Sequence, residues 1–408
     1  MSTRIVIAGG GIVAGYAAKE LVELGIAPGD LTIVSADSAL PYERPPLSKT
    51  FLAGKDTEAA IQIIPEAFYR DHGIDVRLGV SATRLEARRK ALTLSSGEVV
   101  HFENLVLATG SRAAPLKVPG AELANVFYLR SMANSQAIRD RMREARRAVV
   151  IGGGFIAMEV SSVLAQKQIE TTMVLRGDRV WERVFAPEMS ESFERYFASR
   201  GVCFAKRAKV RSFSGKGAVS AAILSDGREL SCDMVVAGVG ARPVTEYLEA
   251  SGMASDNGIR VDEYLETSAP GIFAAGDIAD YPDLIFGKRR RVEHWDNAVS
   301  QARHCARVLS GRREPFRHVP YFFSDIFDLS YEFWGDSTGS DEVVYRGDLG
   351  GVRWSAWWLR GGIVIAGFVM GRPEEEREAA QRWIESQQRV SRERLRSEST
   401  PIEAAVMA

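Results

Sequence analysis

Cysteine is scarce in this chain, which has only Cys203, Cys232 and Cys305 among its 408 residues. The three lie far apart, without the CxxC or CxxxxC spacing that is typical of a redox-active dithiol. This spacing excludes electron transfer through a pair of neighbouring cysteines. We expect all three thiols to be buried as small apolar side chains.

The sequence also lacks an excess of charge of either sign and any long apolar run. Its 52 basic and 53 acidic residues give a formal net charge of -1, so no global field favours nucleic acid or an anionic membrane. No apolar stretch approaches the length of about 18 residues that indicates a membrane-spanning helix. The chain enters a predicted strand by Arg4 without the features of a signal peptide. These absences predict a cytoplasmic protein that contacts neither nucleic acid nor membrane.

Glycine, in contrast, is abundant, and it gathers in two turns of the same form. Residues 4–8 (RIVIA) precede residues 9–15 (GGGIVAG), and residues 148–151 (AVVI) precede residues 152–157 (GGGFIA). The first glycine allows a tight turn, the second lets backbone N–H groups approach a pyrophosphate, and the helix N-terminus adds partial positive charge. One such turn is weak evidence, because glycine clusters also end strands. Two in a strand-turn-helix context predict two dinucleotide sites.

The segments around the two turns repeat one plan, which predicts an α/β protein of two or three domains. Strand, helix and strand are predicted at residues 4–8, 13–24 and 31–35, and again from residue 148 to about residue 175. Each half then has a predicted hairpin, at residues 91–94 with 98–102 and at residues 219–224 with 229–232. Buried strands follow from residues 105, 234 and 272, and a helix is expected at residues 298–309.

From Tyr321 onward the sequence consists of aromatic-rich segments with the pattern of β-strands, which indicates a separate C-terminal α+β domain. Its predicted elements are strands at residues 331–334, 352–359 and 363–369 and a helix from residue 374. The tail after residue 390 is polar and charged, and we expect it to be unstructured or loosely docked. Between the first βαβ unit and the first hairpin, residues 40–49 (LPYERPPLSK) contain three prolines, which predict a rigid, extended loop that holds Arg44 and Lys49.

Together these residues resemble the FAD-dependent, pyridine-nucleotide-linked reductases, in the branch of ferredoxin and rubredoxin reductases, monodehydroascorbate reductase and apoptosis-inducing factor. The resemblance covers nearly the whole chain. Its anchors are residues 9–15, 44–49, 108–110, 152–159, 276–277 and 291–295.

The resemblance implies two Rossmann-like three-layer dinucleotide-binding domains, as in glutathione reductase, plus the C-terminal α+β domain. The implied FAD-binding domain comprises residues 1–120 and 243–320. The NAD(P)H-binding domain comprises residues 121–242, the C-terminal domain residues 321–390 and the polar tail residues 391–408. The implied activity is hydride transfer from NAD(P)H to FAD, followed by electron transfer to an acceptor.

The resemblance also implies the residues that bind the cofactors. They are Gly9, Gly11, Ala14, Asp37, Arg44, Lys49, Ala82, Ala108, Thr109, Gly110, Arg130, Gly152, Gly154, Phe155, Ile156, Glu159, Arg176, Gly240, Gly276, Asp277, Glu293, His294, Trp295 and Phe323. Three of them are implied to be catalytic. Lys49 would stabilise negative charge on the reduced flavin, Glu159 would lie near the nicotinamide, and Trp295 would stack on the flavin or relay electrons.

Several positions depart from the family pattern. Ala36 stands where an acid normally binds the adenosine ribose of FAD, so Asp37 is a substitute candidate. In the second fold the corresponding position is Leu175, followed by Arg176, which favours NADPH, whereas Asp178 could still contact the ribose of NADH. Phe323 occupies a position that is Trp or Tyr in the relatives. No paired-cysteine motif follows the first strand, so electrons are expected to leave directly from the flavin.

The sequence leaves the electron acceptor open. A ferredoxin-type iron–sulfur protein is favoured by a basic run at residues 288–291, which with Arg312, Arg313 and Arg317 would meet an acidic partner. A small oxidant, such as monodehydroascorbate or a quinone, is favoured by residues 321–335, which look more like monodehydroascorbate reductase. A third reading is a redox-sensing flavoprotein similar to apoptosis-inducing factor. The expected assembly is a monomer or a homodimer.

Overall fold

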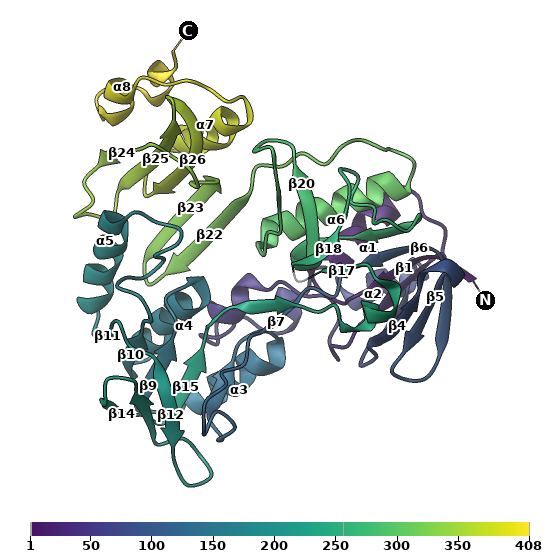
Figure 1. The fold of residues 1–408 in the computed structure, drawn as a ribbon, viewed down its shortest axis with the longest axis horizontal. Helices are drawn as coiled ribbons and strands as arrows, with labels where there is room; N and C mark the ends of the chain where they lie inside the picture. Colours follow the sequence, from purple (N-terminus) through teal and green to yellow (C-terminus); the bar gives the residue numbers. More distant parts are fainter. Residues whose placement is uncertain (1, 256, 408) are drawn as a thin grey trace. The chain divides into compact units, whose positions relative to one another are not determined.

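The computed structural model describes residues 2–255 and 257–407, and the chain divides into two compact units (Figure 1). The first unit consists of Met1–Pro45, Thr57–Arg112 and Ala241–Pro320. The second consists of Pro46–Asp56, Ala113–Gly240 and Tyr321–Ala408. Strands β7 (Ser111–Ala113) and β16 (Ala241–Pro243) lie where the chain passes from one unit to the other.

The first unit is built on a sheet whose central strands are parallel. Its strand order is β3 (Asp75–Arg77), β2 (Leu31–Val34), β1 (Ser2–Ala8), β6 (Val99–Leu107), β5 (Ala91–Leu94) and β4 (Ala82–Glu86), and β19 (Ile272–Ala274) also pairs with β6. Helices α1 (Ile12–Glu23) and α6 (Trp295–Leu309) pack against each other, side by side in Figure 1. Residues 5–8 of β1 form a continuous apolar run and are all buried, as expected for a strand covered on both faces.

Smaller elements complete the first unit. They are α2 (Glu66–Asp71), the sheet of β17 (Ala254–Ser255), β18 (Gly258–Arg260), β20 (Ala279–Asp283) and β21 (Lys288–Arg290), and the 3-10 turns η2 (Ala59–Ile61), η3 (Ala87–Arg89), η4 (Glu246–Ser251) and η5 (Gly276–Ile278).

The strands predicted at residues 98–102 and from residue 105 are one strand, β6. Exposure alternates along its first half, where it pairs with the antiparallel β5, and its last three residues are fully buried between β1 and β19. The two sequence patterns are therefore the outer and inner parts of a single strand, and the predicted break between them is wrong.

The sequence predicted that the proline-rich loop is extended, and this prediction is wrong for part of the loop. Pro45–Ser48 forms a 3-10 turn, η1. Proline is compatible with this conformation because its fixed φ suits the first helical turn and its missing N–H is not needed there.

The second unit contains a fully parallel sheet of the same plan. Its strand order is β11 (Val202–Ala205), β10 (Glu170–Val174), β9 (Arg147–Ile151), β15 (Met234–Ala237) and β8 (Val126–Tyr128). The helices of this part are α3 (Met132–Met142), α4 (Phe155–Gln166) and α5 (Pro187–Ala198). A smaller antiparallel sheet consists of β12 (Val210–Ser214), β13 (Ala221–Leu224) and β14 (Glu229–Ser231).

An antiparallel sheet forms the C-terminal part of the second unit. Its strand order is β22 (Tyr321–Ile326), β23 (Leu329–Gly335), β26 (Ile363–Met370), β25 (Trp354–Arg360) and β24 (Glu342–Gly347), followed by α7 (Glu374–Glu385). Aromatic rings join this sheet to the α5 region: the ring centroids of Phe193 and Tyr331 are 5.4 Å apart, as are those of Phe185 and Phe368. This shared aromatic core explains why the two parts form one unit.

The tail is ordered, so the prediction of an unstructured or loosely docked segment is wrong. Helix α8 (Arg392–Arg396) and the 3-10 turn η6 (Ile402–Ala405) bury Leu395, Ile402 and Ala405. The amino-acid composition of the tail does not reveal this order, because many charged residues separate the three buried ones.

The cysteine prediction holds for Cys232 and Cys305, which are buried, but is wrong for the exposed Cys203. That residue lies on β11, the edge strand of its sheet, where alternate side chains face outward. Among the helices of residues 2–255 and 257–407, none is long and apolar enough to cross a membrane.

The buried guanidinium of Arg346 holds the tail in place. It donates hydrogen bonds to the Glu376 carboxylate at 2.9 Å and to the carbonyl oxygens of Leu395 at 3.2 Å and Thr400 at 2.7 Å. Its side chain is 4% exposed and that of Glu376 is 3% exposed. The contact therefore joins β24, α7 and the tail in a site that excludes water.

We predict that Arg346→Met lowers the free energy of unfolding by about 3 kcal/mol, because it leaves a buried carboxylate with fewer donors. Urea unfolding measures this change. The control is Arg392→Met, which removes an ion pair to Glu342 whose arginine side chain is 72% exposed, and it should cost less than about 1 kcal/mol. Equal effects of the two variants would contradict the conclusion that Arg346 holds the tail in place.

Candidate functional site

The predicted site residues fall into both units. The first unit contains Gly9, Gly11, Ala14, Asp37, Arg44, Ala82, Ala108, Thr109, Gly110, Gly276, Asp277, Glu293, His294 and Trp295, and the second contains Lys49, Arg130, Gly152, Gly154, Phe155, Ile156, Glu159, Arg176, Gly240 and Phe323.

The first glycine turn packs closely on one side and is open on the other. Gly9 has φ +132°, and a Cβ there would lie 2.1 Å from the carbonyl oxygen of Ala108. At Gly11 the nearest neighbouring atom would be a guanidinium nitrogen of Arg44, 3.9 Å away. Helix α1 begins at the next residue, has no acidic side chain in its first turn, and buries Ala14 completely. Open backbone N–H groups at a helix N-terminus, with an arginine beside them, suit an anionic group.

The carboxyl ends of β6 and β19 lie at the same edge of the sheet as this turn, since both strands run parallel to β1. Thr109 follows β6, and its Oγ1 donates to the carbonyl oxygen of Val244 at 2.7 Å. Gly110 accepts a hydrogen bond from the N–H of Val244 at 2.9 Å. Asp277 follows β19, and its carboxylate accepts a hydrogen bond from Ser111 Oγ at 2.6 Å. The preceding Gly276 has φ +78° and leaves no room for a Cβ beside Val13 of α1.

A hydrogen-bonded chain follows the end of β2. The Asp37 carboxylate accepts from the Tyr42 hydroxyl at 2.8 Å, and Arg44 Nη1 donates to that hydroxyl at 2.7 Å. The N–H of Val80 donates to the Ser35 carbonyl at 2.8 Å, which brings the segment leading to Ala82 beside the same strand end. The N–H of Gly79 likewise donates to the Asp37 carbonyl at 3.0 Å, so two backbone hydrogen bonds hold the segment before β4 against the end of β2.

Trp295 shares a carboxylate with a tyrosine, and the sequence reasoning missed that carboxylate. Trp295 Nε1 donates to Glu43 Oε2 at 2.5 Å, and Tyr16 Oη donates to Glu43 Oε1 at 2.6 Å. The two rings meet edge to face with centroids 6.2 Å apart. Burial, together with the hydrogen bond to Glu43, raises the pKa of Tyr16 well above its ordinary value. In the sequence, Glu43 is marked only by its place in the proline-rich loop, directly before the selected residue Arg44.

The two residues before Trp295 are less enclosed. Glu293 is exposed and pairs with Arg291 at 2.5 Å. His294 is half-buried and immediately precedes α6, which begins three residues earlier than predicted.

A polar groove of about 180 Å³ runs between α1 and α6, next to Tyr16. It is lined by Tyr16, Lys19, Glu20, Glu23, Arg303 and Arg307. Arg307 pairs with Glu20 at 2.8 Å, whereas the Arg303 guanidinium lies 5.5 Å from the centre of the Tyr16 ring. Lys19 and Arg303 are exposed, so the groove presents positive charge beside an aromatic pair.

The basic run at residues 288–291 is largely engaged within its own unit. Arg289 pairs with Asp280, Arg290 with Asp283 at 3.0 Å, and Arg291 with Glu293. Arg313 likewise pairs with Glu266 at 2.9 Å. These side chains are fixed by neighbouring carboxylates, so this segment presents less positive charge than its sequence suggests.

The second glycine turn has the same geometry as the first. Gly152 has φ +118°, and a Cβ there would lie 2.3 Å from the carbonyl oxygen of Gly238. A Cβ at Gly154 would meet no neighbour within 4 Å, and α4 begins at the next residue with no acidic side chain in its first turn. Two large apolar side chains beside the turn are exposed, Ile156 at 41% and Val239 at 40%.

Three other predicted residues surround this second turn. Gly240, with φ +115°, follows β15, and Arg130 follows β8, so both lie at the carboxyl edge of the sheet that carries the turn. Phe155 is half-buried, and its ring centroid lies 4.4 Å from that of Phe322 and 5.7 Å from that of Trp181. Open N–H groups, a cation and exposed apolar surface together suit a dinucleotide with a flat ring.

Glu159 lies one to two turns along α4 and is 6% exposed. Its carboxylate accepts hydrogen bonds from Ser48 and, at 2.6 Å, from Ser324 Oγ, and it pairs with Lys49 Nζ at 3.3 Å. Lys49 Nζ also lies 4.5 Å from the centre of the Phe323 ring. The second unit therefore brings Lys49, Glu159 and Phe323 together. The sequence reasoning missed the two serines because each lies more than a hundred positions from Glu159.

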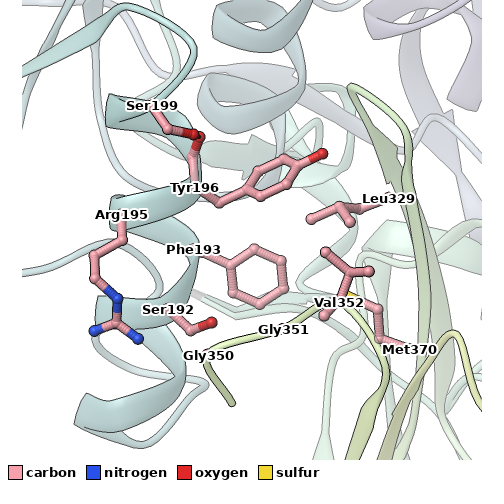
Figure 2. Close-up of a pocket in the computed structure, with 10 residues that line it drawn as sticks. All are labelled: Ser192, Phe193, Arg195, Tyr196, Ser199, Leu329, Gly350, Gly351, Val352 and Met370. Atoms are coloured by element: carbon pink, nitrogen blue, oxygen red, sulfur yellow. The ribbon is translucent and has the colours of Figure 1, made fainter. Parts of the chain in front are cut away.

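A separate pocket of about 200 Å³ opens between α5 and the turn after β24. Figure 2 shows the rings of Phe193 and Tyr196 facing Leu329, Val352 and Met370 across it. Ser192 Oγ donates to the carbonyl oxygen of Leu349 at 2.5 Å on one side. None of the residues predicted from the sequence lines this pocket.

Comparison with known proteins identifies the family. The family described as pyridine nucleotide-disulphide oxidoreductase matches residues 3–302, and the one described as reductase C-terminal matches residues 321–406. The chain belongs to the pyridine nucleotide-disulphide oxidoreductase family. This confirms the resemblance stated from the sequence, and the predicted fold class is confirmed with it.

Several monodehydroascorbate reductases are similar to this reductase over almost its whole length. Monodehydroascorbate reductase 4, peroxisomal, of Arabidopsis thaliana is 36% identical and aligns over 91% of this chain and 80% of its own. The monodehydroascorbate reductase of Pisum sativum is 33% identical over 93% of each chain.

Solved structures agree closely with the fold. The ferredoxin reductase for the CYP199A2 system from Rhodopseudomonas palustris is 33% identical, with a TM-score of 0.95 and full coverage of both chains. Putidaredoxin reductase in its covalent complex with putidaredoxin is 32% identical, with a TM-score of 0.94 over 98% of this chain and 97% of that one.

The protein is accordingly an NAD(P)H-dependent flavoprotein reductase whose cofactors are FAD and NAD(P)H. The residues present fit two such groups, because each of the two glycine turns is open above a helix N-terminus that has no acidic residue in its first turn.

We predict that Gly154→Asp weakens NAD(P)H binding at least tenfold, because the new carboxylate would repel the pyrophosphate. Folding should be preserved, since Gly154 has an ordinary extended backbone (φ -89°), its surroundings are open, and aspartate is a favoured N-cap. Titration with NAD(P)H under anaerobic conditions measures the effect. Gly154→Asn is the neutral control of equal size, and an equal loss in both variants would contradict a charge-based explanation.

Proposed function

We propose that this reductase passes electrons from NAD(P)H through FAD to a ferredoxin-type iron–sulfur protein. The first glycine turn is the proposed site of the FAD pyrophosphate, and the second is the proposed site of the coenzyme pyrophosphate. When bound, FAD accepts electrons from NAD(P)H as a pair and releases them singly. The chain's own residues supply binding, orientation and charge around that chemistry.

The groove between α1 and α6 is the observation that carries this proposal. It lies in the unit that holds the first glycine turn, and its lining includes the exposed cations Lys19 and Arg303. Arg307 is paired with Glu20, and Glu23 is an exposed acid of the same groove. Tyr16 lines the groove and meets Trp295 through the shared Glu43 carboxylate. A charged, open face is suited to transient docking of an acidic protein, whereas a small oxidant needs an enclosing pocket. We therefore place the docking site here rather than at residues 288–291, whose arginines are already paired.

The solved relatives support a protein acceptor. One is a ferredoxin reductase, and another was captured in a complex with putidaredoxin, and both match this chain over nearly all of their length.

We predict that Arg303→Glu lowers kcat/KM for a [2Fe–2S] ferredoxin about tenfold, because it reverses charge at the docking face. The loss should shrink at high ionic strength, where surface charges are screened. Reduction of ferricyanide, which needs no docking face, should be unchanged. The matched control is Arg211→Glu, an exposed arginine of the second unit, which should leave both activities unaltered. If Arg303→Glu also leaves ferredoxin reduction unaltered, the groove is not the docking face.

A small oxidant is the second candidate acceptor, because several monodehydroascorbate reductases are 32–37% identical to this chain. Turnover with monodehydroascorbate that is faster than with every ferredoxin tested, and insensitive to Arg303→Glu, would select this candidate.

We further propose that Lys49 stabilises negative charge on the reduced flavin and that Glu159 positions Lys49 and moderates its charge. Glu159 is the partner of Lys49 at 3.3 Å, and both side chains are less than one-tenth exposed. Their charges therefore act in an environment that screens little.

We predict opposite shifts of the FAD reduction potential in two variants. Glu159→Gln should raise it and Lys49→Met should lower it, each by on the order of 30 mV, which corresponds to about 1.4 kcal/mol for a two-electron couple. Anaerobic redox titration against a reference dye measures both shifts. Glu191→Gln, an exposed carboxylate on α5, is the control and should not shift the potential. Shifts of the same sign in the first two variants would contradict the proposed charge pairing.

A further inference from the structure

The pocket between α5 and the turn after β24 has no part in the proposed electron transfer, yet it has the walls of a ligand site. One wall consists of the rings of Phe193 and Tyr196, and the other consists of the apolar side chains of Leu329, Val352 and Met370 (Figure 2). All five residues belong to the second unit. Aromatic rings opposite apolar side chains suit a flat, apolar molecule.

Both rings of the aromatic wall are held in place by other residues. Phe193 is 2% exposed, and its ring lies 4.9–6.3 Å, centroid to centroid, from those of Trp181, Phe185, Tyr331, Trp354 and Phe368. The Tyr196 hydroxyl donates to the Asp328 carboxylate, and the Arg200 guanidinium lies 3.6 Å from the centre of the Tyr196 ring. A wall that is already ordered loses little conformational entropy when a ligand binds.

The turn on the other side of the pocket is fastened to α5. Ser192 Oγ donates to the carbonyl oxygen of Leu349 at 2.5 Å. The N–H of Gly351 donates to the carbonyl oxygen of Asp348 at 3.0 Å, which closes the turn. Val352 follows directly and is 45% exposed, although it is apolar. A ligand in the pocket would therefore remove apolar surface from water, which favours binding.

Arg195 is the only charged residue among the described residues that line the pocket. It is exposed, and within residues 2–255 and 257–407 its guanidinium forms no ion pair or hydrogen bond. Figure 2 shows its side chain at the rim, directed away from the two rings. The long side chain can turn toward an anion there, and a planar guanidinium matches the two oxygens of a carboxylate.

Two acids lie close to Arg195 along α5, but neither pairs with it in the described structure. Glu194 is buried and pairs with Lys206. Glu191 is exposed, lies one helical turn before Arg195 and does not line the pocket. The cation at the rim is therefore available to a ligand.

The volume of the pocket limits the size of its ligand. The pocket measures about 200 Å³, and an apolar cavity of about 150 Å³ holds one benzene molecule. One six-membered ring with a short substituent therefore fits between the walls, whereas a dinucleotide does not.

We propose that this pocket binds a small aromatic carboxylate. The ring lies between the aromatic wall and the apolar wall, and the carboxylate pairs with Arg195 at the rim. The pocket shares no residue with either glycine turn, so the proposal does not rest on the proposed function.

The test compares phenylacetate with its neutral analogue phenylacetamide, by NMR titration of the FAD-loaded protein without coenzyme. The wild type should bind phenylacetate about fivefold more tightly, as expected for an ion pair at an exposed rim. Arg195→Gln should remove this preference and leave the affinity for phenylacetamide unchanged. Val352→Trp should fill the pocket and weaken both ligands at least tenfold. Arg211→Gln, at an exposed arginine of the second unit, is the matched control and should change neither affinity.

The proposal is overturned if the wild type binds both compounds equally, or if Arg195→Gln keeps the preference, because the pocket then does not recognise the carboxylate. It is also overturned if phenylacetate shows no saturable binding, or if its binding survives Val352→Trp, which would place it elsewhere. A wild-type dimer in sedimentation that Val352→Trp dissociates would assign the pocket to a second copy of the chain. None of these results concerns flavin reduction by NAD(P)H, so the proposed function would stand in each case.

Discussion

The second unit depends on a carboxylate that is almost completely removed from water. Burying an unpaired carboxylate is costly, so Glu159 is stable only because donors converge on it. Those donors come from different parts of the chain: Ser48 and Lys49 from the proline-rich loop and Ser324 from β22. The hydrogen bonds and the ion pair that stabilise the buried Glu159 carboxylate therefore also fix the loop and the C-terminal sheet against α4. This helix begins at the second glycine turn. A second hydrogen bond, from the N–H of Phe327 to Ser162 Oγ at 2.6 Å, reinforces that contact.

The two glycine turns share a backbone geometry but differ in the charges around them. The carboxylates of Asp37 and Asp277 are held by hydroxyl donors beside the first turn, in an arrangement suited to ribose and ribityl hydroxyls. Around the second turn, Arg130 and Arg176 lie at the carboxyl edge of the sheet, and Asp178 on the same loop is paired with Arg207. In the proposed assignment, one fold holds two related cofactors and distinguishes them, because each turn would bind the pyrophosphate that they share and the surrounding side chains would bind what differs.

Features that depend on neighbouring residues could be predicted from the sequence. The glycine turns, the βαβ units and three strands of the C-terminal sheet follow from local patterns of apolar residues and glycine. Features that depend on pairing between distant segments could not. Glu43 gave no local signal that it would join Tyr16 to Trp295, which are 27 and 252 positions away. The basic run at residues 288–291 looked like a docking patch, because a sequence shows the arginines but not Asp280 and Asp283 on the adjacent strand. The ordered tail escaped prediction for the same reason, since Arg346 and its carbonyl partners are about 50 positions apart.

The central claim is that electrons enter from NAD(P)H and leave to a ferredoxin-type protein. Double-mixing stopped-flow spectroscopy under anaerobic conditions tests it most directly: the protein is first reduced with one equivalent of NAD(P)H and then mixed with an oxidised [2Fe–2S] ferredoxin or with monodehydroascorbate. The account predicts rapid bleaching of the flavin in the first step and salt-sensitive reoxidation by the ferredoxin in the second. Rapid bleaching followed by reoxidation with monodehydroascorbate alone would contradict the proposed acceptor, and no bleaching in the first step would contradict the whole account.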